Sequence, residues 1–192
     1  RLRLIAGLFY QRQEHNIEQN YIIPRLADFL VVDGTNNVWS TKHLRVDRDY
    51  AAFGELSFDI TPQLTATAGG RWYKFDNSLV GFFGFNSLLD DGVGYSSNPD
   101  YLCFGPPQVD GSPCTNLDKR TKDSGFVHRL NLTYKPNQDL LFYATWSRGF
   151  RPGGVNRRGT FEPYKPDYLT NYEAGAKISF GRGAHFNAAA YI

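Results

Sequence analysis

Residues that could do enzyme chemistry are scattered in this 192-residue sequence, and no arrangement typical of a catalytic site is present. There is no HxxxH zinc spacing, no G-x-S-x-G elbow, no P-loop and no dinucleotide-binding fingerprint. The acidic pairs Asp47/Asp49 and Asp90/Asp91 are interpreted as solvated loop charges rather than a catalytic pair. We therefore predict that the chain is not an enzyme and has no catalytic residue, no metal site and no cofactor. The histidines stand far apart: His15, His43, His128 and His185.

Three arginines beside a glycine pair have the chemistry to bind an anion. Arg151, Arg157 and Arg158 flank Gly153-Gly154 in one stretch. Guanidinium groups bind carboxylates and similar oxyanions through paired hydrogen bonds, so an anionic ligand such as a ferric chelate would fit. The alternative is ordinary strand-end and loop electrostatics.

Aromatic residues among glycines form a second group of candidate ligand contacts. Phe83, Tyr95 and Tyr101 lie within residues 76–123, a stretch predicted to be a long loop. Exposed aromatic rings on a tethered loop suit the capture of planar or aromatic ligands. The alternative is that these rings pack against each other and order the loop.

The two cysteines lie in the same stretch, eleven positions apart. Spacing and context predict a disulfide between Cys103 and Cys114 in an oxidising compartment. Two free thiols are the alternative. A metal site is disfavoured because no histidine or further cysteine flanks the pair.

The elements that would carry these residues are strands, because polarity alternates along the chain in at least six segments. From Tyr50 to Ile60, even positions are mostly apolar, while Glu55 and Asp59 take odd positions. A strand sends successive side chains to opposite faces, so one face is apolar and the other polar. A segment of about 9–11 residues is long enough to cross a bilayer as a tilted strand. The pattern predicts an all-β, antiparallel transmembrane barrel.

Seven strands are predicted, with spans near 2–12, 48–60, 64–75, 124–135, 140–151, 170–180 and 184–192. Short connections at 61–63, 136–139 and 181–183 alternate with long ones at about 13–47, 76–123 and 152–169. Outer-membrane barrels alternate short periplasmic turns with long extracellular loops in this way. The whole chain, 1–192, is interpreted as part of one barrel domain. We expect it to be a fragment of a longer barrel whose C-terminal strands lie outside it.

Aromatic residues of the apolar parity form two bands that flank aliphatic residues. The loop-end band is Tyr10, Tyr50, Trp72, Phe126, Trp146 and Tyr172, and the turn-end band is Phe58, Tyr134, Phe142, Phe180 and Phe186. Two such girdles mark the interfaces of a membrane barrel. Beyond the loop-end band, four basic residues share the outward parity: Arg12, Lys74, His128 and Arg148. They predict contact with phosphates of outer-leaflet lipopolysaccharide, or else ordinary solvated strand ends.

Composition excludes other classes. The net charge is +2, from 21 basic and 19 acidic residues, which is too balanced for a nucleic-acid partner. No apolar run approaches the roughly 18 residues that a transmembrane helix needs.

Several segments resemble strands of TonB-dependent outer-membrane receptors. The most specific is the run from 141 to 154, LFYATWSRGFRPGG, followed by LTNYEAGAK at 169–177 and NAAAY at 187–191. YAAFGE at 50–55 and AGGRW at 68–72 are similar to earlier strands of that family. The resemblance covers about 50–75 and 124–192.

The resemblance implies a barrel of 22 strands closed by a plug in the outer membrane of a Gram-negative bacterium. It also implies capture of a scarce nutrient, a ferric siderophore first, and import energised through the TonB complex. Two alternatives stay open: a passive porin-type barrel and a soluble carbohydrate-binding β-sandwich. The sandwich predicts that the even positions form a core between two sheets.

Overall fold

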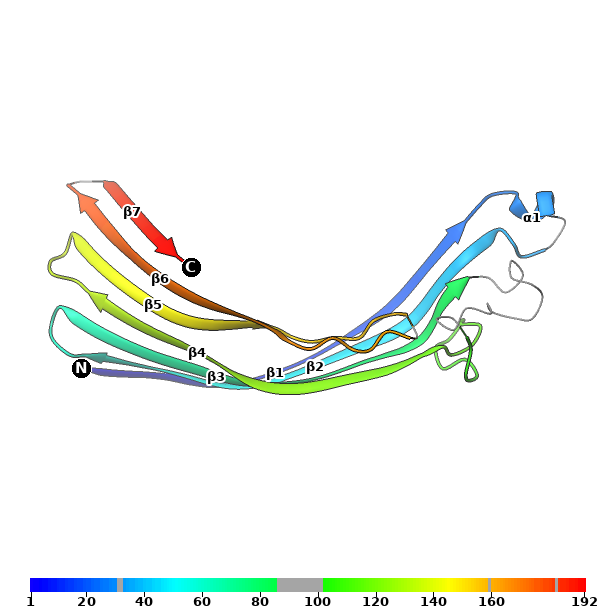
Figure 1. Cartoon of the computed structure of the whole chain (residues 1–192), viewed down its shortest axis with the longest axis horizontal. Helices are drawn as coiled ribbons and strands as arrows, with labels where there is room; N and C mark the ends of the chain where they lie inside the picture. Colours follow the sequence, from blue (N-terminus) through cyan, green and yellow to red (C-terminus); the bar gives the residue numbers. More distant parts are fainter. Residues whose placement is uncertain (31–32, 86–101, 159, 182) are drawn as a thin grey trace.

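The computed structural model describes residues 1–30, 33–85, 102–158, 160–181 and 183–192. They form one antiparallel sheet whose strand order follows the sequence, as predicted. The strands are β1 (Leu2–Ile22), β2 (Asn37–Asp59), β3 (Leu64–Phe85), β4 (Leu117–Tyr134), β5 (Leu140–Arg151), β6 (Asp167–Phe180) and β7 (Ala184–Tyr191). A short helix, α1 (Leu26–Leu30), lies between β1 and β2. Figure 1 shows a long, bent sheet with the short turns at one end and the long connections at the other.

The first four strands extend further toward the long connections than the sequence pattern predicted. β1 continues to Ile22, β2 begins at Asn37 and β3 continues to Phe85. In these extensions both faces carry polar residues, as at Glu14 and Glu18 on one face of β1 and Gln13 and Gln19 on the other. The alternation of polarity therefore ends while the backbone ladder continues, because pairing requires only backbone groups.

The apolar face of the sheet is uncovered, which contradicts the sandwich alternative. Leu56 is 42% exposed, and Ala66 and Leu132 line the same broad apolar depression of about 920 Å³ on this face. Among the described residues there is a single sheet and no second layer over these positions. We call this the outer face and the opposite one the inner face.

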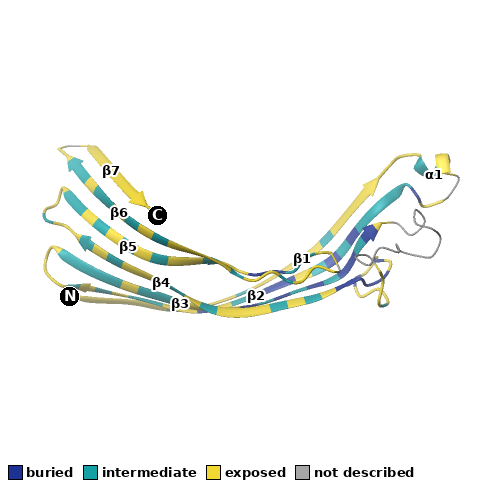
Figure 2. Cartoon of the chain, in the orientation of Figure 1, coloured by how far each residue is buried: buried dark blue, intermediate teal, exposed yellow. Residues whose placement is uncertain are grey.

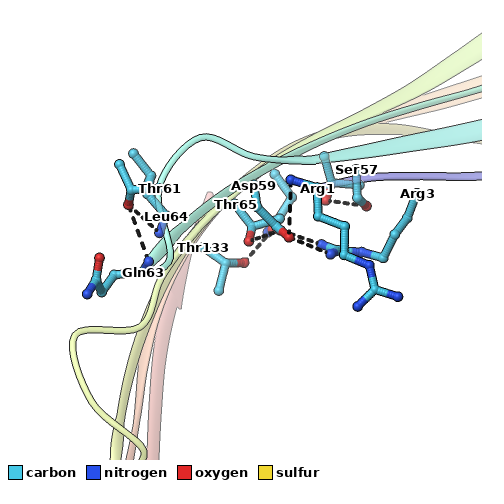
Figure 3. Close-up of polar contacts among 11 residues, drawn as sticks. Arg1, Arg3, Ser57, Asp59, Thr61, Gln63, Leu64, Thr65 and Thr133 are labelled. Atoms are coloured by element: carbon cyan, nitrogen blue, oxygen red, sulfur yellow. Dashed lines mark hydrogen bonds and ion pairs between the residues drawn. The ribbon is translucent and has the colours of Figure 1, made fainter.

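The inner face carries the charged and polar pairs predicted to face the lumen. Near the turns, Arg3 donates two hydrogen bonds to Asp59, at 2.7 and 2.6 Å, and Thr65 donates a third at 2.9 Å (Figure 3). This links β1, β2 and β3. Further up, Tyr143 donates to Glu173 at 2.5 Å, so β5 and β6 are joined in the same way.

Buried side chains gather beyond the loop-end aromatic band, toward the long connections (Figure 2). The fully buried ones include Phe75, Phe82, Leu117 and His43. Two segments cover this part of the sheet. The segment 102–116 packs near Phe82, and the end of the β5–β6 hairpin packs on Tyr73. Within the described residues, no helix is long and apolar enough to cross a membrane.

Candidate ligand site on the inner wall

A cavity of about 460 Å³ lies between the inner face of the sheet and the β5–β6 hairpin. Arg45 of β2 and Asn77 of β3 form its wall. Arg151 and the following residues Pro152 and Gly153 cover it, together with Tyr164. We call it the inner-wall cavity.

The hairpin reaches the inner wall because β5 stops pairing with β4 beyond Ser147. The ring of Phe150 stacks on Tyr73, with centroids 3.6 Å apart and planes 8° from parallel. The hydroxyls of Tyr73 and Tyr168 are 2.6 Å apart. Aromatic stacking and burial of Tyr73 to 2% exposure stabilise this contact. The side of the hairpin that carries Phe150 and Tyr168 therefore lies against β3.

The connection at the tip of the hairpin is itself ordered. Gly154 and Tyr164 exchange two backbone hydrogen bonds, at 3.1 and 2.9 Å. A Cβ at Gly153 would lie 2.5 Å from the carbonyl oxygen of Tyr164, so only glycine allows the two chains to approach this closely. From β4, Lys119 donates to the carbonyls of Arg158 and of Phe161, the latter at 2.7 Å. These bonds hold the connection over the sheet.

The electrostatics around the cavity are cationic. Arg45 donates to Asp47 at 2.8 Å, and Arg151 pairs with Asp167. Among the described residues, no carboxylate forms an ion pair with Arg157. Burial, and then the charges of Arg157 and Arg45, lower the pKa of His43 from 6.5 to about 4. His43 is thus neutral at physiological pH, and the arginines provide the positive charge.

Three buried polar atoms next to the cavity have no hydrogen-bond partner among the described residues. They are Nδ1 of His43, Oδ1 of Asp47 and Oδ1 of Asn77. These residues are 1%, 8% and 5% exposed, and Asn77 lines the cavity. Buried polar groups are normally paired, because an unpaired one costs about 1–3 kcal/mol. The arrangement suits a ligand that combines negative charge with hydrogen-bond donors.

The sequence-predicted ligand residues divide into three groups. Arg151 lines the cavity and Arg157 lies close enough to lower the pKa of His43. Arg158 instead lies over the ring of Phe161, 5.4 Å from its centroid, and Phe83 packs edge-on against Trp39 at 4.6 Å. Tyr95 and Tyr101 lie outside the described residues.

Sequence reasoning missed Arg45, Asn77 and Tyr164. Arg45 and Asn77 have the inner-face parity, but they stand in segments that were predicted to be loops. Extending the odd-position parity of β2 past Asp49 would have placed Arg45 on the inner wall. No sequence signal indicated Tyr164, because its position depends on the docked hairpin.

The predicted disulfide is present. Cys103 and Cys114 are bonded, and no free cysteine exists. Backbone bonds of 3.0 Å join Phe104 to Thr115 and Thr115 to Gly105. The side chain of Asn116 accepts from the amide of Phe83 at 2.9 Å and donates to its carbonyl at 3.0 Å. This closed segment therefore extends the edge of the loop-side sheet.

The four predicted basic residues of the outer face do not stay together. Arg12 pairs with Glu14 at 2.5 Å, and the ring of His128 lies edge-on to Trp146, 4.6 Å between centroids. Arg148 is a correction: its guanidinium lies 4.0 Å over the ring of Tyr168, on the hairpin face that packs against the inner wall. Beyond Ser147 the hairpin no longer follows β4, and the face that carries Arg148 packs against the inner wall. The prediction from strand parity that Arg148 lies on the outer face was therefore wrong.

Comparison with known proteins agrees with this architecture. Residues 2–192 match the family model described as TonB dependent receptor-like, beta-barrel. The ferric yersiniabactin uptake receptor FyuA from Yersinia pestis is similar in fold, with a TM-score of 0.71 at 17% identity. The match covers 99% of this chain and 25% of that receptor.

The ferric-catecholate import receptor Fiu from E. coli K12 is similar in both its open and closed forms. Each form gives a TM-score of 0.63, at 13% and 14% identity. The matches cover 99% of this chain and 27% or 28% of the receptor, so the chain spans about a quarter of the length of these structures. With the family model matched over nearly its full length, the chain belongs to the β-barrel family of TonB-dependent receptors.

Proposed function

We propose that this chain is part of the barrel wall of an outer-membrane receptor that captures a ferric siderophore and imports it with energy from the TonB complex. The inner-wall cavity carries the proposal. It combines Arg45 and Arg151 with buried acceptors, and Arg157 lies close enough to His43 to add positive charge. The receptors of similar fold take up ferric yersiniabactin and ferric catecholates, and they suggest the ligand class.

The chemistry of the cavity favours an anionic chelate. Iron(III) bound by three catecholates carries net negative charge, whereas iron(III) bound by three hydroxamates is neutral. Hydrogen bonds from arginine to a charged ligand contribute about 1.5–3 kcal/mol each, which corresponds to roughly a tenfold to hundredfold change in affinity. Amide N–H groups in the backbone of such a siderophore also supply donors for Asn77 and Asp47.

The test uses the full-length receptor in outer membranes and radiolabelled iron. Arg45→Gln and Arg151→Gln should each weaken binding of a ferric tris-catecholate by about tenfold or more. Arg12→Gln, on the outer face, is the matched control and should leave binding unchanged. A neutral ferric tris-hydroxamate should be insensitive to all three substitutions. Equal binding by the variants and the unaltered receptor would contradict the assigned site.

Energisation is tested separately from binding. Collapse of the inner-membrane proton gradient should stop accumulation of the chelate while surface binding persists. Accumulation that continues without the gradient would instead indicate a passive porin.

Lipid contact on the outer face is a second part of the proposal. Arg12 and Arg48 are direct cross-strand partners on the loop side of the loop-end aromatic band. Like charges directly opposite each other destabilise a strand pair, and an anion between them relieves this repulsion. We propose that a phosphate of outer-leaflet lipopolysaccharide binds there. Arg48→Gln should lower the amount of lipopolysaccharide that copurifies with the receptor, and unchanged retention would overturn this part.

A further inference from the structure

The sheet divides into two branches between β4 and β5. These strands pair only from Arg129↔Ser147 to Tyr134↔Phe142. Toward the loops, β4 continues to pair with β3 as far as Leu117, and β5 continues with β6 as far as Arg151↔Asp167. Figure 1 shows the loop-side ends of β5 and β6 separating from β4. Among the strands that the structure describes, the part of β4 from 117 to 128 therefore pairs with β3 alone.

A glycine permits the position that the hairpin occupies. Gly125 of β4 is the direct partner of Tyr73. A Cβ at Gly125 would lie 2.4 Å from the hydroxyl oxygen of Tyr73 and 2.9 Å from that of Tyr168. Real Cβ atoms do not approach oxygen so closely, so a side chain at this position would displace the hydroxyl ends of Tyr73 and Tyr168, whose contact holds the hairpin on the inner wall. We call the observed arrangement the docked position.

The free edge of β4 matches the hairpin in register and in polarity. Continuing the β4–β5 register by three residues would pair Phe126 with Phe150. Phe150 shares the parity of Trp146, so its ring would then lie on the outer face beside Phe126. An unpaired stretch of strand next to a complementary strand is a ready site for pairing. Gly149, directly on the loop side of the fork, would meet no atom within 4 Å if it carried a Cβ, so the space on that side of the chain is open.

We propose that the β5–β6 hairpin moves between this docked position and a zipped position in which residues 148–151 pair with β4, and that docking assembles the ligand site. In the docked position Arg151 and Tyr164 face Arg45 and Asn77 across the inner-wall cavity. In the zipped position Arg151 returns to the line of the barrel wall, and the cavity loses its cover. Gly125, Tyr73 and Tyr168 are then positioning residues for the site.

This arrangement predicts that the ligand selects the docked position. A ligand can shift such an equilibrium only by binding one position better than the other, and only the docked one offers both walls of the cavity. This last step rests on the proposed function, whereas the existence of two positions does not.

The zipped position is tested by cross-linking in the full-length receptor. Phe126→Cys and Phe150→Cys place thiols on neighbouring strands in the zipped position and on opposite sides of β4 in the docked one. Under mild oxidation this pair should form a disulfide in more of the protein than the out-of-register control pair, Phe126→Cys with Gly149→Cys. Cross-linking no greater than in the control would overturn the proposal.

A second measurement keeps Phe150 in place. Gly125→Val should exclude docking and favour zipping, so backbone amides within 126–128, which residues 148–150 would then pair with, should exchange with deuterium more slowly than in the unaltered receptor. Gly105→Val, where a Cβ would meet nothing within 4 Å, is the matched control and should leave these amides unchanged. Faster or unchanged exchange in Gly125→Val would count against the zipped position.

Adding a ferric tris-catecholate separates the two proposals. It should reduce cross-linking of the Phe126→Cys, Phe150→Cys pair. If cross-linking occurs but the chelate does not reduce it, the two positions stand, and the assembled ligand site is wrong.

Discussion

The turn-side half and the loop-side half of this sheet are stabilised by different surroundings. On the turn side the sheet is a single layer, and apolar residues such as Leu56 and Leu132 are 42% and 45% exposed. On the loop side other segments of the chain cover part of the sheet, and Phe75, Phe82 and Leu117 are 1% exposed. One strand, β3, thus depends on external hydrocarbon at one end and on a protein core at the other.

The difference shows what each half needs in order to fold. A barrel wall in lipid must satisfy its backbone within the sheet, and the outward side chains need only be apolar. A wall above the membrane meets water and must bury apolar area against other parts of the chain. The disulfide-closed segment and the docked hairpin perform this role, one on each side of β3.

The largest expected effect comes from a charge on the turn-side outer face. Ala68→Arg places a guanidinium between the two aromatic bands and should destabilise the barrel by about 2–4 kcal/mol, because arginine on the lipid face loses its hydration. Thr67→Arg, one residue earlier and on the inner face, is the control. The amount of folded receptor is read from its heat-modifiable mobility on gels. Equal amounts for both variants would remove the distinction between the faces.

Removing the disulfide should affect the loop-side half alone. The variant Cys103→Ser with Cys114→Ser should lose roughly 2–4 kcal/mol of local stability, since the closed loop no longer restricts the opened chain. Limited proteolysis should then cut within 102–116 while the turn-side strands resist. The unaltered receptor under reducing conditions is the control. Loss of heat-modifiable mobility in the variant would show that the two halves do not fold independently.

A smaller effect is expected from pH. The pKa of His43 is about 4 in the folded protein, below the ordinary value near 6.5, because the ring is buried beside Arg157 and Arg45. Between these values the opened form binds more protons, so opening of the loop-side half becomes easier as pH falls from about 6.5 to about 4. The slope is at most one proton, or about tenfold in the opening constant per pH unit.

Hydrogen exchange of residues 41–49 as a function of pH measures this dependence. His43→Gln removes the titrating group and should flatten the curve in that window. A curve that stays equally steep in the variant would assign the titration to another residue.

The same contrast explains what the sequence predicted. The faces of the turn-side strands follow from the position of charges such as Glu55 and Arg129, since a charge in hydrocarbon is costly enough to enforce a strict alternation. Above Tyr50 and Trp72 both faces meet water or protein, so polarity no longer marks the strand. The extensions of β1 to β4 were therefore missed.

The ligand site depends on contacts that no local pattern encodes. Arg151 and Arg157 were identified from residue type and from the adjacent glycines. Their neighbours Arg45 and Asn77 come from strands about a hundred residues earlier, and the hairpin meets them through Tyr73 and Phe150. A one-residue detail, the absence of a side chain at Gly125, permits that contact, and its significance is visible only in three dimensions.

The smallest expected effect compares ion pairs in the two halves. On the loop-side outer face Arg120 donates to Asp76 at 2.6 Å, and these hydrogen bonds lower the pKa of the carboxyl group. The side chains are 63% and 16% exposed, and such a pair contributes little because water screens it. A double-mutant cycle with Asp76→Asn and Arg120→Gln should therefore give a small coupling.

The turn-side pair of Arg3 and Asp59 provides the matching cycle, with Asp59→Asn and Arg3→Gln. Asp59 also accepts from Thr65, so this pair belongs to a network of three strands that is fixed in geometry. Both arginines donate two hydrogen bonds to their carboxylate. The coupling of Arg3 and Asp59 should exceed that of Arg120 and Asp76, because Thr65 already holds the Asp59 carboxylate in place and less side-chain entropy is lost when the pair forms. Equal coupling in the two cycles would mean that the inner wall near the turns is as well solvated as the outer face near the loops.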